Sequence, residues 1–127
     1  MNNNLLVVGG TGFIGSSITE EALKQGYNVT VVSKEHIPLE KNTKRVTYIP
    51  VDISNKIDLC IALDKKNFNY VINLAGYVDH SDYFDGGDEV VKAHLYGTLN
   101  LISCIYKKNE YRYKKNNYKK TAHLRLW

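Results

Sequence analysis

Several residue types that would restrict the fold are scarce in this 127-residue chain, which has two cysteines, two prolines, one methionine and one tryptophan. Two cysteines are too few for the dense disulfide framework of a small secreted domain. No apolar run approaches the ~18 residues of a membrane-spanning helix. No positively charged segment precedes the first apolar run, so we expect no signal peptide. These absences predict a single globular domain in the cytoplasm, away from membranes, with Cys60 and Cys104 as buried free thiols.

Charge is divided unevenly along the chain. Residues 1–105 carry nine Lys and Arg against twelve Asp and Glu, whereas residues 106–127 carry eight against Glu110 alone. The second segment is mostly Lys, Asn and Tyr and has no strand or helix period. We therefore predict a domain over residues 1–106 and a basic, poorly ordered tail over residues 107–127. The tail is consistent with a shifted reading frame, a truncated gene product or a genuine basic extension.

A basic tail that contains Tyr could bind nucleic acid, because bases stack on aromatic rings and phosphates attract Lys and Arg. A solvated run of charge explains the same composition with fewer assumptions. Nucleic acid is therefore not an expected partner.

The hydrophobic pattern alternates between strand and helix. Strands are predicted at residues 5–8, 29–32, 45–49 and 70–74, and helices at residues 13–24, 57–63 and 89–105. We expect Gly26 to end the first helix in a left-handed conformation, Ser54 to cap the second and Asp88 to cap the third. The alternation predicts an α/β fold with a parallel sheet, helices on both faces and the strand order 3-2-1-4.

The stretch LLVVGGTGFIG at residues 5–15 places glycines where a buried strand turns into a helix. Gly9 allows the tight turn, Gly12 lets backbone amides approach a pyrophosphate, and Gly15 lets the helix pack close to the sheet. The free N–H groups and the dipole at a helix N-terminus stabilise an anion there. The loop is therefore a candidate dinucleotide site.

The glycine spacing, G-x-x-G-x-x-G, points to a particular family. VVGGTGFIGSSI resembles the opening motif of the extended short-chain dehydrogenases/reductases, the NAD-dependent epimerase/dehydratase group. VTVVSK, VDIS, VINLAG and AHLYGTLNLIS follow in that family's order, so the resemblance covers residues 4–106. It implies a Rossmann-like fold, incomplete here with four strands, and NAD or NADP as cofactor. It also implies a nucleotide-sugar substrate that is oxidised by hydride transfer to the nicotinamide and then reduced.

The resemblance also implies a set of cofactor-binding residues along these motifs. The pyrophosphate group would lie on Gly9, Thr11, Gly12, Phe13, Ile14 and Gly15. Ser33 and Lys34 would face the adenosine ribose, Asp52 and Ile53 the adenine, and Leu74, Ala75 and Gly76 the inner pocket. His94 stands where the family usually has Asn, and it either contacts the cofactor side of the pocket or fills space.

The end of the second strand bears on the choice of cofactor. Ser33 stands where NAD-using relatives carry an acidic residue that bonds the ribose 2′-hydroxyl, and Lys34 follows it. A hydroxyl and an ammonium can both bind a 2′-phosphate, so NADP is slightly favoured. Glu35, one residue later, keeps NAD open.

The catalytic residues of the family, a Tyr-x-x-x-Lys pair and an upstream Ser or Thr, are not assigned to any position. The strand expected to carry the Ser should fall near residues 112–118, where RYKKNNY is too polar for a central strand. Tyr111 and Lys115 fit the spacing but come too early, which favours coincidence. The chain is therefore either an epimerase/dehydratase-like protein or an inactive dinucleotide-binding fragment. A missing fifth strand would expose the edge of the fourth, so we expect marginal stability or self-association.

Acidic residues recur in the segment DHSDYFDGGDE, at Asp79, Asp82, Asp85 and Asp88. Their spacing does not fit a hard-metal loop, and a polar loop at the sheet edge is the favoured interpretation. The resemblance places this loop near the substrate, which makes Tyr77 and His80 candidate substrate contacts.

Overall fold

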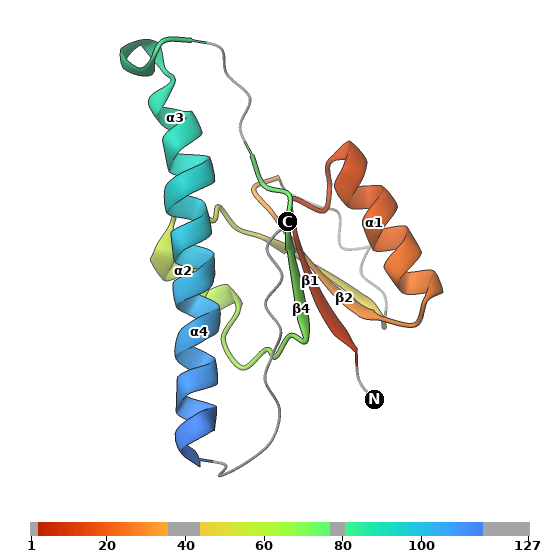
Figure 1. The fold of residues 1–127 in the computed structure, drawn as a ribbon. Helices are drawn as coiled ribbons and strands as arrows, with labels where there is room; N and C mark the ends of the chain where they lie inside the picture. Colours follow the sequence, from red (N-terminus) through yellow and green to blue (C-terminus); the bar gives the residue numbers. More distant parts are fainter. Residues whose placement is uncertain (1–2, 36–43, 77–80, 116–127) are drawn as a thin grey trace.

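The sheet has the predicted topology. A computed structural model describes residues 3–35, 44–76 and 81–115 (Figure 1). Its strands are β1 (Asn4–Val8), β2 (Asn28–Ser33), β3 (Val46–Pro50) and β4 (Tyr70–Asn73). All neighbours are parallel, and the order is β3-β2-β1-β4. The predictions of a parallel Rossmann-like sheet and of its strand order are therefore confirmed.

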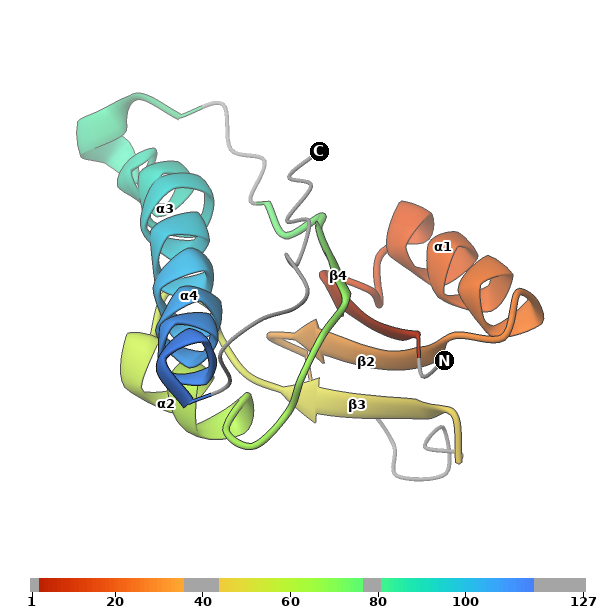
Figure 2. The ribbon, with the colours of Figure 1, turned by 60° about the horizontal axis from the view of Figure 1, so that its bottom comes forward.

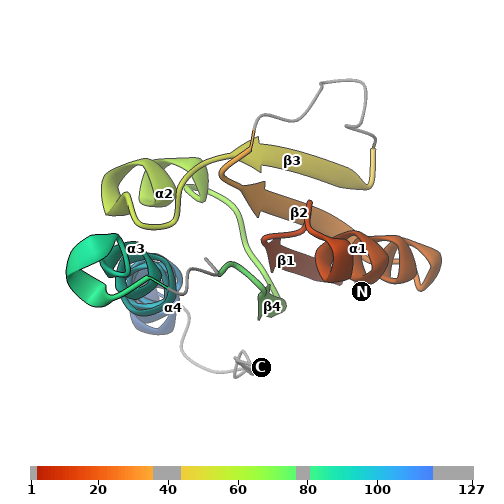
Figure 3. The same cartoon turned by 90° about the horizontal axis from the view of Figure 1, so that it is seen from above.

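Helices cover both faces of the sheet, as predicted. α1 (Phe13–Lys24) lies on one face, and α2 (Lys56–Ala62) and α4 (Gly97–Lys115) lie on the other (Figure 3). Between β4 and α4 the chain forms η2 (Tyr83–Asp85), α3 (Asp88–Val91) and a π-helical turn, η3 (Lys92–Tyr96). Figure 2 shows α2 and α4 side by side. Among the described residues, none of the helices is both long and apolar enough to cross a bilayer.

The core follows from the alternation of side chains along the central strand β1. Leu5 and Val7 pack toward α1, and Leu6 and Val8 pack toward α2 and α4. The larger cluster lies under α2 and α4, where Leu59, Leu63 and Leu101 are at most 1% exposed. Burying each such side chain contributes about 1.5–3 kcal/mol.

Gly26 ends α1 in the predicted left-handed conformation, with φ of +91°. The Tyr27 N–H donates to the Ala22 carbonyl and the Gly26 N–H to the Leu23 carbonyl. This pair of bonds is the Schellman arrangement, which satisfies carbonyls at the end of a helix.

The two predicted helix caps are wrong by one position each. Asn55 rather than Ser54 caps α2, because its Oδ1 accepts from the Asp58 N–H at 3.2 Å. Gly87 precedes α3, and Asp88 is the first residue inside it, where its carboxylate pairs with Lys92 at 2.8 Å.

The last helix is longer than its apolar period predicted. Helical structure runs from Asp88 to Lys115 through the π-helical turn, so residues 107–115 are helical rather than the start of an irregular tail. Neither Gly nor Pro occurs in residues 98–115, and Lys, Arg and Glu are good helix formers. A helix can therefore continue without an apolar stripe. The rest of the predicted tail, residues 116–127, lies outside the described residues.

The expectation of two free thiols is wrong. Cys60 on α2 and Cys104 on α4 form a disulfide, with their Cα atoms 5.2 Å apart. Their sequence separation of 44 residues hid the pairing. Only the packing of α2 and α4 on the same face of the sheet brings the two sulfur atoms together.

Candidate dinucleotide-binding site

The glycine loop after β1 packs so tightly that neighbouring backbone atoms exclude a side chain at Gly9 and at Gly15. Gly9 has φ of +76°, and a Cβ there would lie 2.9 Å from the backbone of Leu74 and Ala75. A Cβ on Gly15 would collide with the Gly9 carbonyl oxygen and would lie 2.6 Å from the Gly10 Cα. The first and last glycines therefore have the predicted roles, a tight turn and close packing of the helix.

Gly12 differs from these two glycines. A Cβ there would meet only the Gly9 carbonyl oxygen, at 3.5 Å, and the backbone is extended with φ of −70° and ψ of 174°. Neither the fold nor the backbone conformation thus requires glycine at this position. Gly12 is the N-cap of α1 and has no side chain to bond the first-turn N–H groups. The open space and the uncapped helix end together suit an anion that approaches the backbone.

Phe13 and Ile14 begin α1 but do not belong to its buried face. They are 92% and 62% exposed, whereas Gly15, Thr19 and Ala22 are buried. The buried face of α1 therefore begins at Gly15, one residue after this exposed pair. Both side chains instead flank the uncapped helix end.

Thr11 and Ser33 connect the glycine loop to the end of β2. Their hydroxyl oxygens share a hydrogen bond of 2.8 Å, and the Gly9 N–H donates to the Val32 carbonyl at 2.7 Å. Ser33 is 7% exposed, and its hydroxyl also accepts from the Glu35 N–H. Its hydroxyl thus holds two loops together.

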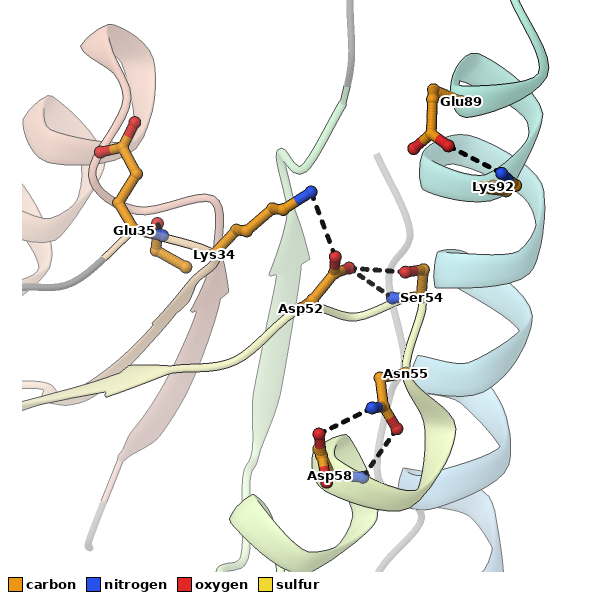
Figure 4. A network of polar contacts seen from close by, with 9 residues as sticks. Lys34, Glu35, Asp52, Ser54, Asn55, Asp58, Glu89 and Lys92 are labelled. Atoms are coloured by element: carbon orange, nitrogen blue, oxygen red, sulfur yellow. Dashed lines mark hydrogen bonds and ion pairs between the residues drawn. The ribbon is translucent and has the colours of Figure 1, made fainter. Parts of the chain in front are cut away.

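Lys34 and Asp52 connect the ends of β2 and β3 (Figure 4). Lys34 Nζ lies 3.3 Å from Asp52 Oδ2, while Asp52 Oδ1 accepts from the N–H and hydroxyl of Ser54. Partial burial raises the pKa of Asp52, but the Ser54 hydrogen bonds and the Lys34 ammonium outweigh burial and lower it overall. The carboxylate is therefore ionised and held in one orientation at neutral pH.

The segment after β4 is held by Asn73 and His94. Asn73 accepts from the Ala75 N–H at 3.1 Å and donates to Thr98 Oγ1 at 3.2 Å. The His94 imidazole packs on Gly76, where a Cβ would lie 2.7 Å from its Cε1. His94 sits in the middle of the π-helical turn, a rare geometry that is frequent at functional sites. The structure thus places His94 beside the predicted inner pocket.

α4 holds the loop that contains the predicted adenine contacts. Asn100 Nδ2 donates to the carbonyl oxygens of Ile53 and Ser54, both at 3.0 Å. A Cβ on Gly97 would lie 2.6 Å from Ile53 Cδ1, so the helix backbone touches that side chain. Ile53 is 6% exposed, which leaves its backbone rather than its side chain for a ligand.

The sequence analysis did not identify three residues that hold the loops of this site, Asn73, Thr98 and Asn100. The sequence does contain a signal for the two asparagines. Asn73 is the polar residue inside the apolar run of the fourth strand, and Asn100 lies between Leu99 and Leu101 on a helix. An amide in such a place usually has a hydrogen-bonding partner. The predicted cofactor-binding residues that directly follow β1, β2, β3 and β4 lie at the carboxyl edge of the strands, where doubly wound sheets bind ligands.

Comparison with known proteins identifies the family of this chain. The sequence matches the NAD dependent epimerase/dehydratase family over residues 5–116. The chain belongs to that family. It is 29% identical over 114 residues to the UDP-N-acetyl-alpha-D-glucosaminuronate decarboxylase of Bacillus cytotoxicus, covering 84% of this chain and 34% of the relative. It is 32% identical over 113 residues to a UDP-glucose 4-epimerase of Schizosaccharomyces pombe, covering 83% and 32%.

Solved structures give the same result. A short chain dehydrogenase from Leptospira borgpetersenii with bound NAD+ superposes with a TM-score of 0.76 at 25% identity, over 91% of this chain and 49% of that one. The Thermus thermophilus UDP-glucose 4-epimerase complex with NAD gives 0.68 at 28% identity, over 80% and 33%. The chain therefore spans about a third of the length of the curated epimerase/dehydratase relatives that it matches.

Tyr111 and Lys115 do not lie at the carboxyl edge of the sheet. Both fall at the end of α4, which points away from the carboxyl edge of the sheet (Figure 1). Tyr111 follows His94 by four to five helical turns, a rise of roughly 25 Å. Among the described residues, no group of His, Cys, Asp and Glu could hold a metal ion. Tyr77, Asp79 and His80 lie outside the described residues.

Proposed function

We propose that this chain is the dinucleotide-binding part of a nucleotide-sugar epimerase/dehydratase and binds NAD or NADP at the glycine loop. The observation that carries the proposal is Gly12, which neither the fold nor its backbone conformation requires and which leaves the N-terminus of α1 open. The first-turn N–H groups and the helix dipole would hold the pyrophosphate. Phe13 and Ile14 would cover it from the solvent side.

The remaining groups would orient the two ends of the cofactor. Asp52 and the backbone of Ile53 would face adenine, and Ala75, Gly76 and His94 would line the path toward nicotinamide. A nicotinamide bound there would accept a hydride from the sugar and return it. The relatives named above act on UDP-sugars by name, which supports a nucleotide sugar as the substrate class.

We propose further that residues 3–115 bind cofactor without turnover. Among the described residues, no Tyr-x-x-x-Lys pair with an upstream Ser or Thr lies at the carboxyl edge of the sheet. Without a group to move the hydroxyl proton, hydride transfer from a sugar has no acid-base partner. The alternative, an active epimerase, predicts conversion of UDP-glucose into its 4-epimer when UDP-glucose and NAD+ are mixed with the protein, because the hydride is returned to the sugar.

NADP is the cofactor that the end of β2 favours. No carboxylate occupies position 33, and the Lys34 ammonium is exposed, with 76% of its side chain accessible. Because Ser33 is committed to Thr11, Lys34 alone would bind a 2′-phosphate, in competition with Asp52. The preference is accordingly expected to be modest.

Calorimetric titration with NAD+ and with NADP+ tests the proposal. The Gly12→Val variant keeps an allowed backbone but fills the open space, so its affinity should fall by about tenfold, which corresponds to ~1.4 kcal/mol. Ser17→Ala, at an exposed position in the second turn of α1, is the control and should bind like the wild type. Absence of heat from the folded wild-type protein at millimolar cofactor, or equal binding by Gly12→Val, contradicts the proposal.

A cytoplasmic location stays a prediction. The pairing of Cys60 with Cys104 removes the argument from free thiols, since disulfides are uncommon in reducing compartments. The cytosolic disulfides that do occur are usually transient, catalytic or redox-sensing, which bears on the role of this one.

A further inference from the structure

The disulfide connects two helices that both shape the dinucleotide site. Cys60 is half-buried and lies on α2, the helix that follows the turn containing Asp52 and Ile53. Cys104 lies on α4 and is 5% exposed, within the core cluster. The bond therefore ties α4 to the segment that follows β3.

α4 and the turn that precedes it contact both loops of the site. Asn100 bonds the carbonyls of Ile53 and Ser54, and Gly97 packs on the Ile53 side chain. One helical turn earlier, His94 packs on Gly76 after β4. A shift of this helix relative to α2 would therefore displace the adenine side and the nicotinamide side of the site together.

We infer that the Cys60–Cys104 disulfide is a redox-controlled clamp that sets how tightly the site holds its dinucleotide. The inference rests on the proposed function. With the bond intact, α2 and α4 are held at fixed separation and the loop between β3 and α2 is preorganised, so the ligand does not have to order it. With the bond reduced, α4 retains its core contacts but the loop gains freedom, and binding must then restrict it.

Opening the clamp requires a reductant, and we propose a dithiol for this role. A thiolate of the reductant attacks the more accessible Cys60 Sγ, the S–S bond breaks, and Cys104 leaves as a thiolate that takes up a proton. The second thiolate of the reductant then displaces Cys60, which takes up a proton in turn. Two electrons and two protons pass to the protein, and the reductant becomes a disulfide. Cys104 Sγ lies 3.9 Å from the Lys56 carbonyl oxygen, so the new thiol has an acceptor.

The test compares the affinity of the full chain for NAD+ and NADP+ before and after reduction with dithiothreitol, alongside a count of free thiols. We expect no free thiol before reduction and two afterwards, with affinity for the better-bound cofactor lower by about fivefold when reduced. Cys60→Ser should bind the cofactor weakly in both conditions, and dithiothreitol should not change its affinity. Ile61→Ser, at an exposed position on the same helix, is the matched control and should respond like the wild type.

The outcomes separate this inference from the proposed function. Equal affinity in both redox states, or two free thiols before reduction, overturns the clamp and leaves cofactor binding intact. Absence of binding in both states overturns the proposed function and the clamp with it. Because the wild-type comparison uses no substitution, a Cys60→Ser variant that fails to fold does not remove the test.

Discussion

The Nζ atom of Lys34 lies 3.3 Å from Oδ2 of Asp52 and so joins the ends of β2 and β3 at the carboxyl edge of the sheet. The two side chains are 76% and 39% exposed. An ion pair this accessible contributes little to stability, because water solvates both charges almost as well. Its significance is therefore that it places a cation and an anion where the adenosine part of a cofactor would lie.

Replacing Lys34 with Ala tests the preference for NADP. Loss of a charge-assisted hydrogen bond to the 2′-phosphate should weaken NADP+ binding by about tenfold or more. NAD+ has no phosphate there and should bind within about twofold of the wild type. Dissociation constants for both cofactors, measured by calorimetry, give the ratio directly.

Lys24→Ala is the control for net charge. Lys24 is 73% exposed and lies 4.0 Å from Glu21 at the far end of α1. It should leave both affinities unchanged. A Lys34→Ala protein that binds NADP+ and NAD+ in the wild-type ratio would show that this ammonium does not select the cofactor.

Asp52 makes stability depend on pH in a defined direction. Burial raises the pKa of Asp52, but the Ser54 hydrogen bonds and the Lys34 ammonium lower it by more. The pKa in the folded state therefore lies below the ordinary 3.8. A carboxyl with a depressed pKa in the folded state stabilises the protein above pH 3.8 and loses that contribution as pH falls through the lower value. Urea midpoints measured between neutral and strongly acidic pH should therefore fall more for the wild type than for Asp52→Asn. Parallel curves for the two proteins would refute this account.

The strand order, the end of α1 and the glycine loop could be predicted because local sequence determines them. Apolar runs separated by helices require parallel crossovers, and Gly26 and Gly9 occupy positive-φ positions that strongly favour glycine. Gly15 was predictable for a related reason, since close helix packing leaves no room for a Cβ. Each of these signals is contained within one strand, turn or helix.

The features that were missed depend on contacts between distant elements. The Cys60–Cys104 bond and the Asn100 bridge to Ile53 both require α2 and α4 to pack on the same face, 44 and 47 residues apart in sequence. The length of α4 was missed for another reason. Its polar end has helix propensity but no amphipathic period, and it is the period that marks a helix in a sequence most clearly.

Removing the disulfide should destabilise the fold. Closing a loop of 44 residues restricts the unfolded chain, and such a cross-link contributes about 2–4 kcal/mol. Urea denaturation of Cys60→Ser should show a loss in this range relative to the oxidised wild type. It should show little difference from the wild type kept in dithiothreitol. Equal stability of oxidised and reduced wild-type protein would mean that the bond is absent in solution or that the unfolded state compensates for it.

Self-association is expected from two exposed features, the outer edge of β4 and one face of the last helix. Among the described strands, β4 pairs with β1 alone, so its other edge has unpaired backbone groups. Leu95, Leu99 and Tyr106, all near one face of the last helix, are 52%, 51% and 63% exposed. We expect sedimentation to show concentration-dependent association, and a free energy of unfolding for the monomer below about 8 kcal/mol, in the lower part of the ordinary range.

Leu99→Lys separates the helix face from the strand edge. The residue is half exposed, so a charge there should leave the fold intact while it opposes burial of the helix face. Association should weaken in Leu99→Lys and persist in Ile57→Lys, which places the same charge at a 73% exposed position on α2. If Leu99→Lys associates like the wild type, the β4 edge is the contact, because backbone pairing does not depend on that side chain. A wild-type protein that stays monomeric at high concentration with an unfolding free energy above about 8 kcal/mol would exclude both contacts and the marginal stability inferred from them.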